Sequence, residues 1–422
     1  MPLPVPPLLL TVIMSLGLLF ILLLSSRACA DGTDQAFVGT VPNGSFVLQP
    51  GRGQQLLVGG TDFHALVQSV QALKAQLDTL TQQLTDGQQC VPVADTTTIM
   101  GLPEMVGKYS GGVLAGNGKI YMIPRSDESV LILDPTTNAI DTTSITGLTG
   151  GTNKWYGGVL ADNGKIYGIP VGAASVLIID PVTNAVDTTT LAGLNSGTAN
   201  ADSKWAGGAV ARNGKIYCVP ISTVSVLIID PATNTTDVTT IAGLAPVGGG
   251  WTSAVLAGNG KIYGIPADWP SVLIIDAETN TADTTTITGL TGNAKWSGGV
   301  LAGNGKIYGI PYDSASVLVI DPSTDSVATI GSFASGNAKW LNGALANDGK
   351  IYGLPAREAT VLVIDPAANS TTLIATDVTA AAGKWHAGVL AGNGMIYGVP
   401  WAATSVLIIR LSCTIVDVWQ GL

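Results

Sequence analysis

Short apolar runs separated by turn residues recur along most of the chain, and no helical periodicity interrupts them. The nine residues GNGKIYGIP begin at Gly258 and return unchanged at Gly303. The tyrosine of this phrase occurs seven times, with spacings of 46, 50, 46, 45, 44 and 45 residues, at Tyr121, Tyr167, Tyr217, Tyr263, Tyr308, Tyr352 and Tyr397. A tandem period of this length is a better guide to domain organisation than chain length.

Each repeat divides into four strand-like runs. The first two, GGVLA and KIYGIP, meet across Asn-Gly, which favours a type I′ hairpin with both central residues at positive φ. The third and fourth, SVLIID and DTTTI, meet across Asp-Pro-x-Thr-Asn, which suits a type I turn. The third run lacks alternation, as in a strand buried on both faces, and the fourth is polar like a solvated edge strand. Seven such units predict an all-β, seven-bladed β-propeller of four-stranded antiparallel blades over residues 88–422.

The unit KIYGIP followed by SVLIIDPxTN resembles the YVTN-type repeat of surface proteins. Its Gly-Gly pair with a downstream Tyr is similar to the kelch repeat, although the glycine doublet falls on a different strand here. The resemblance covers residues 94 to about 410 and implies a propeller. It implies little about function, since these families include adhesins, scaffolds and enzymes.

The two ends of the repeat region complement each other. ADTTTI at 94–99 precedes the first full repeat, whereas the last repeat ends in SVLIIRL with no fourth run after it. Strand 94–99 is therefore predicted to complete the final blade. Alignment to the repeat places Cys90 and Cys413 at the interrupted turn, which predicts a disulfide there; the alternative is two unpaired thiols. Cys218 is expected to be a buried structural thiol.

The first 87 residues differ in composition from the repeats. Residues 1–30 contain a 17-residue apolar run from Leu8 followed by Ala28-Cys29-Ala30, which predicts a secretory signal peptide that removes Cys29; the alternative is an uncleaved membrane anchor. Residues 31–60 are expected to form a small β or linker region. A heptad seam over 63–84 predicts an amphipathic helix within 61–87. This helix either packs against the propeller or forms a homo-oligomeric coiled coil.

Composition and charge narrow the class of partner. Of 422 residues, 46% are hydrophobic, 11% are charged, and the net charge is −10. An acidic chain without a basic cluster disfavours nucleic acid as a partner. Export would also make three sequons, at Asn43, Asn234 and Asn369, available for glycosylation. We therefore expect a secreted, extracellular or cell-surface protein.

Few residues suggest chemistry. The chain has two histidines, His64 and His386, and lacks the short motifs of zinc proteases, phosphate-binding loops or serine hydrolases. We expect no metal, no cofactor and no catalytic residue. The aspartates before the DPxTN turns are expected to serve those turns, and the lysines after Asn-Gly to be solvated.

Two sets of residues could form a binding surface. One set occupies the start of the first run of each repeat, where burial between blades is the alternative: Trp155, Trp205, Trp251, Trp296, Trp340 and Trp385. The other set lies in the variable loops between the second and third runs, which either specialise or merely tolerate change: Asp268, Trp269, Tyr312, Asp313, Arg357 and Trp401.

The sequence thus favours a non-catalytic adhesive or structural propeller that binds a glycan or protein on its axial face. The alternative is a propeller-type lyase or hydrolase with an axial active site. Its candidate residues are Asp127, Glu128, Asp268, Asp313, Arg357, Glu358 and His386.

Overall fold

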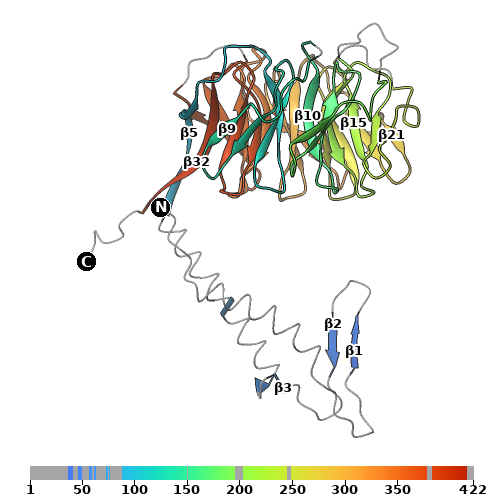
Figure 1. The fold of residues 1–422 in the computed structure, drawn as a ribbon. Helices are drawn as coiled ribbons and strands as arrows, with labels where there is room; N and C mark the ends of the chain where they lie inside the picture. Colours follow the sequence, from blue (N-terminus) through green and yellow to red (C-terminus); the bar gives the residue numbers. More distant parts are fainter. Residues whose placement is uncertain are drawn as a thin grey trace. The chain divides into compact units, whose positions relative to one another are not determined.

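The computed structural model describes residues 88–149, 151–194, 203–244, 249–377 and 383–415, together with 37–40, 46–49, 57–58, 61–62, 73–74 and 76. The chain divides into two units, Met1–Gln89 with Ile415–Leu422, and Cys90–Thr414. The second unit contains seven four-stranded antiparallel sheets arranged as a ring (Figure 1). This confirms the predicted seven-bladed propeller.

Six blades use four consecutive strands each. Blade 1 contains β6 (Tyr109–Leu114), β7 (Ile120–Pro124), β8 (Leu131–Asp134) and β9 (Ala139–Asp141). Blade 2 contains β10 (Trp155–Leu160), β11 (Ile166–Pro170), β12 (Leu177–Asp180) and β13 (Ala185–Asp187). Blade 3 contains β14 (Trp205–Val210), β15 (Ile216–Pro220), β16 (Leu227–Asp230) and β17 (Thr235–Asp237).

The next three blades repeat this order. Blade 4 contains β18 (Trp251–Leu256), β19 (Lys261–Pro266), β20 (Leu273–Asp276) and β21 (Thr281–Asp283). Blade 5 contains β22 (Trp296–Leu301), β23 (Ile307–Pro311), β24 (Val317–Asp321) and β25 (Ser326–Ile330). Blade 6 contains β26 (Trp340–Leu345), β27 (Ile351–Pro355), β28 (Thr360–Asp365) and β29 (Ser370–Ala375).

Blade 7 combines both ends of the propeller sequence. Its strands are β30 (Trp385–Leu390), β31 (Ile396–Pro400), β32 (Ser405–Ile415) and β5 (Gln88–Met100), in that order. The segment 94–99 thus provides the outer strand of the last blade, and blue-green β5 lies beside red β32 in Figure 1. Cys90 and Cys413 lie within these strands, not at a turn. Their side chains are outside the described part, so the disulfide stays a prediction.

The hydrophobic core lies between the blades. Each of seven clusters joins residues of two neighbouring sheets; Val113 and Tyr121 of blade 1, for example, pack with Trp155 and Leu177 of blade 2. The third strands are buried on both faces, as their uninterrupted apolar runs predict. Cys218 is a buried, unpaired thiol in one of these clusters, and burial raises its pKa.

The Asn-Gly hairpins differ from the expected type I′ geometry. Gly118 has a φ of +78°, but Asn117 has no positive φ. Gly118 N donates to Ala115 O at 3.0 Å, and Ala115 N donates to Lys119 O at 2.9 Å. This is a three-residue loop, a type I turn followed by a left-handed glycine. The type I′ prediction was wrong because the glycine alone supplies the required conformation.

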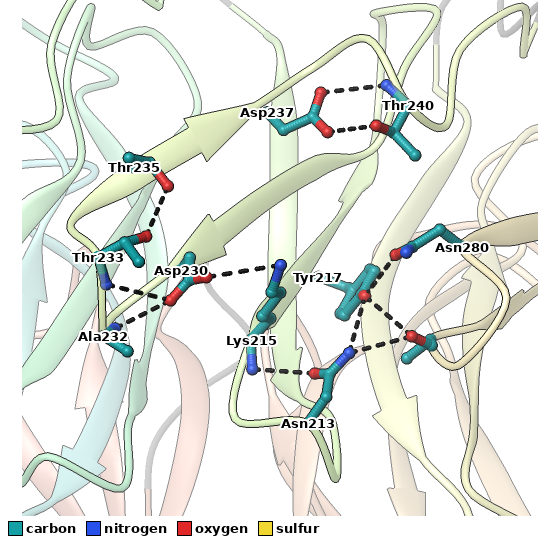
Figure 2. Close-up of polar contacts among 11 residues, drawn as sticks. Asn213, Lys215, Tyr217, Asp230, Ala232, Thr233, Thr235, Asp237, Thr240 and Asn280 are labelled. Carbon is teal, nitrogen blue, oxygen red and sulfur yellow. Dashed lines mark hydrogen bonds and ion pairs between the residues drawn. The ribbon is translucent and has the colours of Figure 1, made fainter.

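In several blades the tyrosine of the repeat makes a polar contact with the next blade, as the hydroxyls of Tyr121, Tyr217, Tyr263 and Tyr397 do. Figure 2 shows this contact for Tyr217 of blade 3, whose hydroxyl donates to Asn280 Oδ1 of blade 4 at 2.7 Å. Asn213 Nδ2 donates to the same hydroxyl at 3.2 Å and to Ala277 O of blade 4 at 3.0 Å. Asn280 can accept this bond because its φ of +53° turns it back towards the preceding blade. The DPxTN turn therefore also fixes the spacing between blades.

The repeated aspartates satisfy turn and strand-end amides. Asp230 Oδ1 accepts hydrogen bonds from the amides of Ala232 and Thr233, at 3.0 and 3.3 Å, and the carboxylate pairs with Lys215 at 3.5 Å (Figure 2). Asp237, at the end of the outer strand, accepts from the amide and hydroxyl of Thr240. These hydrogen bonds lower the pKa of Asp237 to about 2.

The smaller unit is described only in part. β1 (Phe37–Thr40) pairs with β2 (Phe46–Gln49), and β3 (Leu57–Val58) pairs with β4 (Thr61–Asp62). The predicted signal peptide and most of the predicted helix over 61–87 lie outside the described residues, as does the sequon at Asn43. Asn234 and Asn369 are exposed in turns. Within the described residues, no helix has the length and apolar character needed to cross a membrane.

Candidate axial binding site

A cavity of about 480 Å³ opens at the end of the ring where the loops after each second strand meet the connections entering each first strand. Residues from two positions of the repeat supply most of the cavity wall. The residue after the aromatic of the first strand contributes Tyr156, Thr252, Ser297, Leu341 and His386. The residues after the proline of the second strand contribute Arg125, Ala267, Asp268, Tyr312, Ala356, Arg357 and Trp401.

Each first strand contains a β-bulge beside the residue that lines the cavity. In blade 2, Trp155 pairs with Pro170 and Gly158 with Gly168, so one extra residue is inserted between them. Gly157, with a φ of +73°, absorbs the change in direction. Successive side chains of a strand point to opposite faces. Trp155 packs between the blades, whereas Tyr156 lines the cavity.

Residues from both positions meet in an aromatic cluster on one side of the cavity. The ring of His386 stacks on Trp401, with centroids 5.0 Å apart and planes 20° apart. Tyr156 meets His386 edge to face at 4.8 Å. Arg125 Cζ lies 4.6 Å from the Trp401 centroid and 5.3 Å from that of Tyr156, within cation–π range. Three blades thus hold a rigid, partly cationic aromatic wall.

Burial sets the protonation of this cluster. It lowers the pKa of His386 to about 3, with a smaller contribution from the positive charge of Arg125. Burial also raises the pKa of Tyr156 and lowers that of Arg125. Near neutral pH, His386 and Tyr156 are therefore uncharged, while the guanidinium keeps its charge. His386 Nδ1 is buried without a hydrogen-bond partner among the described residues.

Buried lysines hold the loops around the cavity. Lys295, at the start of the first strand of blade 5, is 4% exposed. Its ammonium donates to Ala267 O at 2.6 Å, Trp269 O at 3.0 Å and Gly292 O at 2.9 Å. The first two carbonyls belong to the variable loop of blade 4. Burial lowers the pKa of Lys295 to about 8.

Of the six tryptophans predicted as candidate binding residues, five do not line the cavity. All six are at most 5% exposed and belong to the clusters between blades. Each indole N–H donates to the carbonyl twenty residues later, as Trp155 Nε1 does to Ser175 O at 2.9 Å. Only Trp296 also contributes to the described wall.

The loop candidates divide into two groups. Asp268, Tyr312, Arg357 and Trp401 line the cavity. Trp269 instead packs on Trp251, with ring centroids 5.6 Å apart. Asp313 Oδ1 accepts from Ala338 N at 2.7 Å and supports the loop backbone. Asp127, Glu128 and Glu358, named for the enzyme alternative, do not belong to the wall.

The sequence did not lead us to expect that the residue after the first-strand aromatic lines the cavity. Tyr156, Thr252, Ser297 and Leu341 follow the tryptophan that begins each first strand, a position that holds Tyr, Ala, Thr, Ser, Leu and His in blades 2 to 7. That isolated variation was the available signal. Metal binding has no comparable support, since no group of three or more His, Cys, Asp or Glu side chains is found in the described part of the chain.

Fold and cavity together define a seven-bladed β-propeller with an axial cavity. No family description and no curated protein matches the sequence. Among solved structures, virginiamycin B lyase from Staphylococcus aureus is similar, with a TM-score of 0.61 and 11% identity over 77% of this chain and 100% of that chain. A streptogramin B lyase gives a TM-score of 0.58 and 12% identity, over 76% and 98% of the two chains.

The extracellular domain of a putative one-component system from B. thetaiotaomicron is also similar. Its TM-score is 0.57 and its identity 10%, over 76% of this chain and 40% of that chain. Identities this low show a shared fold alone.

Proposed function

We propose that the protein is a non-catalytic binding protein of the extracellular space or cell surface, and that it takes a glycan or glycoprotein ligand in the axial cavity. The supporting observation is a cavity of about 480 Å³ walled by Tyr156, Tyr312 and Trp401 from three blades. This volume suits a small ligand. Aromatic faces offer apolar area to a sugar ring, while Thr252 and Ser297 can hydrogen-bond its hydroxyl groups.

Several observations support an extracellular location. The sequence predicts a signal peptide over residues 1–30, and two of its sequons, Asn234 and Asn369, are exposed. Some similar solved structures are extracellular domains. A coiled coil over 63–84 would make binding multivalent, as an adhesive or scaffold role requires.

The protonation of His386 argues against acid–base catalysis in the cavity. A general acid or base works best with a pKa near the working pH, but that of His386 is about 3. Asp268 is the one carboxylate on the described wall, and Ala294 N donates to its Oδ1 at 2.5 Å. The cavity is therefore better equipped to bind than to transfer protons.

A lyase is the second candidate because the propeller resembles streptogramin B lyases over nearly their whole length. A catalytically inactive variant of the S. aureus enzyme, solved with quinupristin, replaces a histidine by alanine. In this chain His386 lines the cavity. Mass spectrometry of quinupristin incubated with the protein tests this candidate. Turnover that is lost in His386→Ala would replace the binding proposal by the lyase.

Binding is tested on a glycan array with the wild-type protein, Trp401→Ala and Val182→Ala. Trp401 is on the cavity wall, whereas Val182 is 91% exposed in the β12–β13 turn. We expect binding by the wild type and by Val182→Ala, and its loss in Trp401→Ala. Equal binding by all three proteins would move the site away from the cavity.

A further inference from the structure

Arg125 is fixed on the cavity wall by its backbone. Arg125 N donates to Lys108 O at 2.9 Å, and its carbonyl accepts from Lys154 N at 2.7 Å. The guanidinium lies over Trp401 and Tyr156, which come from blades 7 and 2. Its position is thus determined before any ligand arrives.

This guanidinium has no anionic partner in the described structure. The ion pairs found there are Lys215–Asp230, Lys306–Asp321 and Lys350–Asp365. Arg125 has only the two ring contacts, so its fork of N–H donors is unused in the described structure. A partly buried cation without a counter-ion loses hydration that an incoming anion can replace.

The remaining charges of the wall reinforce this imbalance. Arg357 also lines the cavity, and no ion pair of the described structure involves it. Nearby Lys154 is already engaged, because its ammonium donates to Asp127 O at 2.8 Å and Gly151 O at 3.2 Å. Among the described lining residues, Asp268 is the one carboxylate. The cavity is locally cationic in a protein whose net charge is −10.

We infer, resting on the proposed function, that the ligand is an acidic sugar whose oxyanion, a carboxylate or a sulfate, binds Arg125. The planar guanidinium can hold two oxygens of either group at once. Trp401 and Tyr156 flank that position. The unpartnered Nδ1 of His386, on the same wall, is a second polar group that a ligand can satisfy.

The test compares array glycans that differ only in charge. The acidic probes end in glucuronate, N-acetylneuraminate or galactose 6-sulfate, and their neutral counterparts carry a reduced carboxyl group or no sulfate. We expect acidic probes to bind at least about tenfold more tightly, from one charge-assisted contact. The preferred class distinguishes a carboxylate from a sulfate.

Arg125→Gln should remove this preference, while Arg212→Gln, in the β14–β15 loop away from the cavity, should keep it. Arg125→Lys keeps the positive charge but loses the planar N–H donors of the guanidinium, so it should retain part of the preference for acidic probes. Equal binding of acidic and neutral probes by the wild type overturns this inference alone. Failure to bind any glycan overturns the glycan proposal as well.

Discussion

The hydroxyl of Tyr397 in blade 7 lies 3.0 Å from Oδ1 of Asn138 in blade 1, although 259 positions separate the two residues. The same hydroxyl lies 3.2 Å from Pro135 O and accepts from Asn393 Nδ2 at 2.9 Å. The last blade is thus joined to the first by the contact that joins Tyr121 to Asn184 of the second. The ring is therefore closed by the same tyrosine–asparagine contact that joins blades 1 and 2, in addition to the β5–β32 pairing.

Tyr397→Phe should lower the free energy of unfolding by about 1–3 kcal/mol, because Oδ1 of the half-buried Asn138 in blade 1 loses its donor. Tyr308→Phe is a matched control, since the hydroxyl contact described for Tyr308 is with Asn304 of its own blade. Urea unfolding followed by tryptophan fluorescence measures both. An equal loss in the two variants would mean that the contact with blade 1 adds nothing.

Gly111→Ala should destabilise the propeller by about 2 kcal/mol or more, through left-handed strain and overpacking. Gly111 has a φ of +87°, and a Cβ there would lie 2.5 Å from Gly157 Cα in the next blade. Gly116→Ala should cost much less, since a Cβ at Gly116 meets nothing within 4 Å. Thermal unfolding that ranks these two variants in the reverse order would contradict the close packing around the axis.

Lys384→Met should flatten the dependence of stability on pH between about 8 and 10. Burial lowers the pKa of Lys384 to about 8, well below the value of about 10.4 for a solvated lysine. Above pH 8 the unfolded chain binds more protons at this group, so the wild-type free energy of unfolding gains from it as pH rises. The contribution is at most about 3 kcal/mol. Urea unfolding of the wild type and Lys384→Met at pH 8, 9 and 10 measures this slope.

His386 should remain neutral in the folded protein throughout pH 5 to 8, because its pKa is about 3. NMR titration of its ring protons checks this directly. The unfolded chain binds a proton at this residue below about pH 6.5, so acid should progressively destabilise the wild type towards pH 3. His386→Gln should lose that part of the acid sensitivity. A titration midpoint near 6.5 would reopen the lyase candidate.

The strand pattern could be predicted because the same runs and turns recur in every repeat. The apolar runs, the turn residues between them and the unpaired run at 94–99 together specify the blades and their closure. The hairpin type was wrong because Asn-Gly suits both a two-residue type I′ loop and a three-residue loop in which only the glycine is left-handed. The burial of the lysines before the first strands was not foreseen, since it depends on carbonyls that accept from their ammonium groups, such as Asp127 O for Lys154 and Ala267 O for Lys295.

The cavity was only partly predictable, for a geometric reason. The variable loops pointed to Tyr312 and Trp401, but the sequence did not show which of Trp155 and Tyr156 packs between the blades and which lines the cavity. The larger aromatic attracted attention and turned out to be buried between blades. A position that varies inside an otherwise constant motif was the better indicator.

The placement of β5 has a consequence for biosynthesis. β5 is the first propeller strand to be synthesised, but its partner β32 begins only at Ser405. At usual translation speeds β5 therefore stays unpaired for on the order of tens of seconds. During that time it is an unpaired edge that could capture another nascent chain. Asp95 within its run of threonines, like the aspartates of the other outer strands, would keep the waiting segment soluble until the ribosome releases its partner.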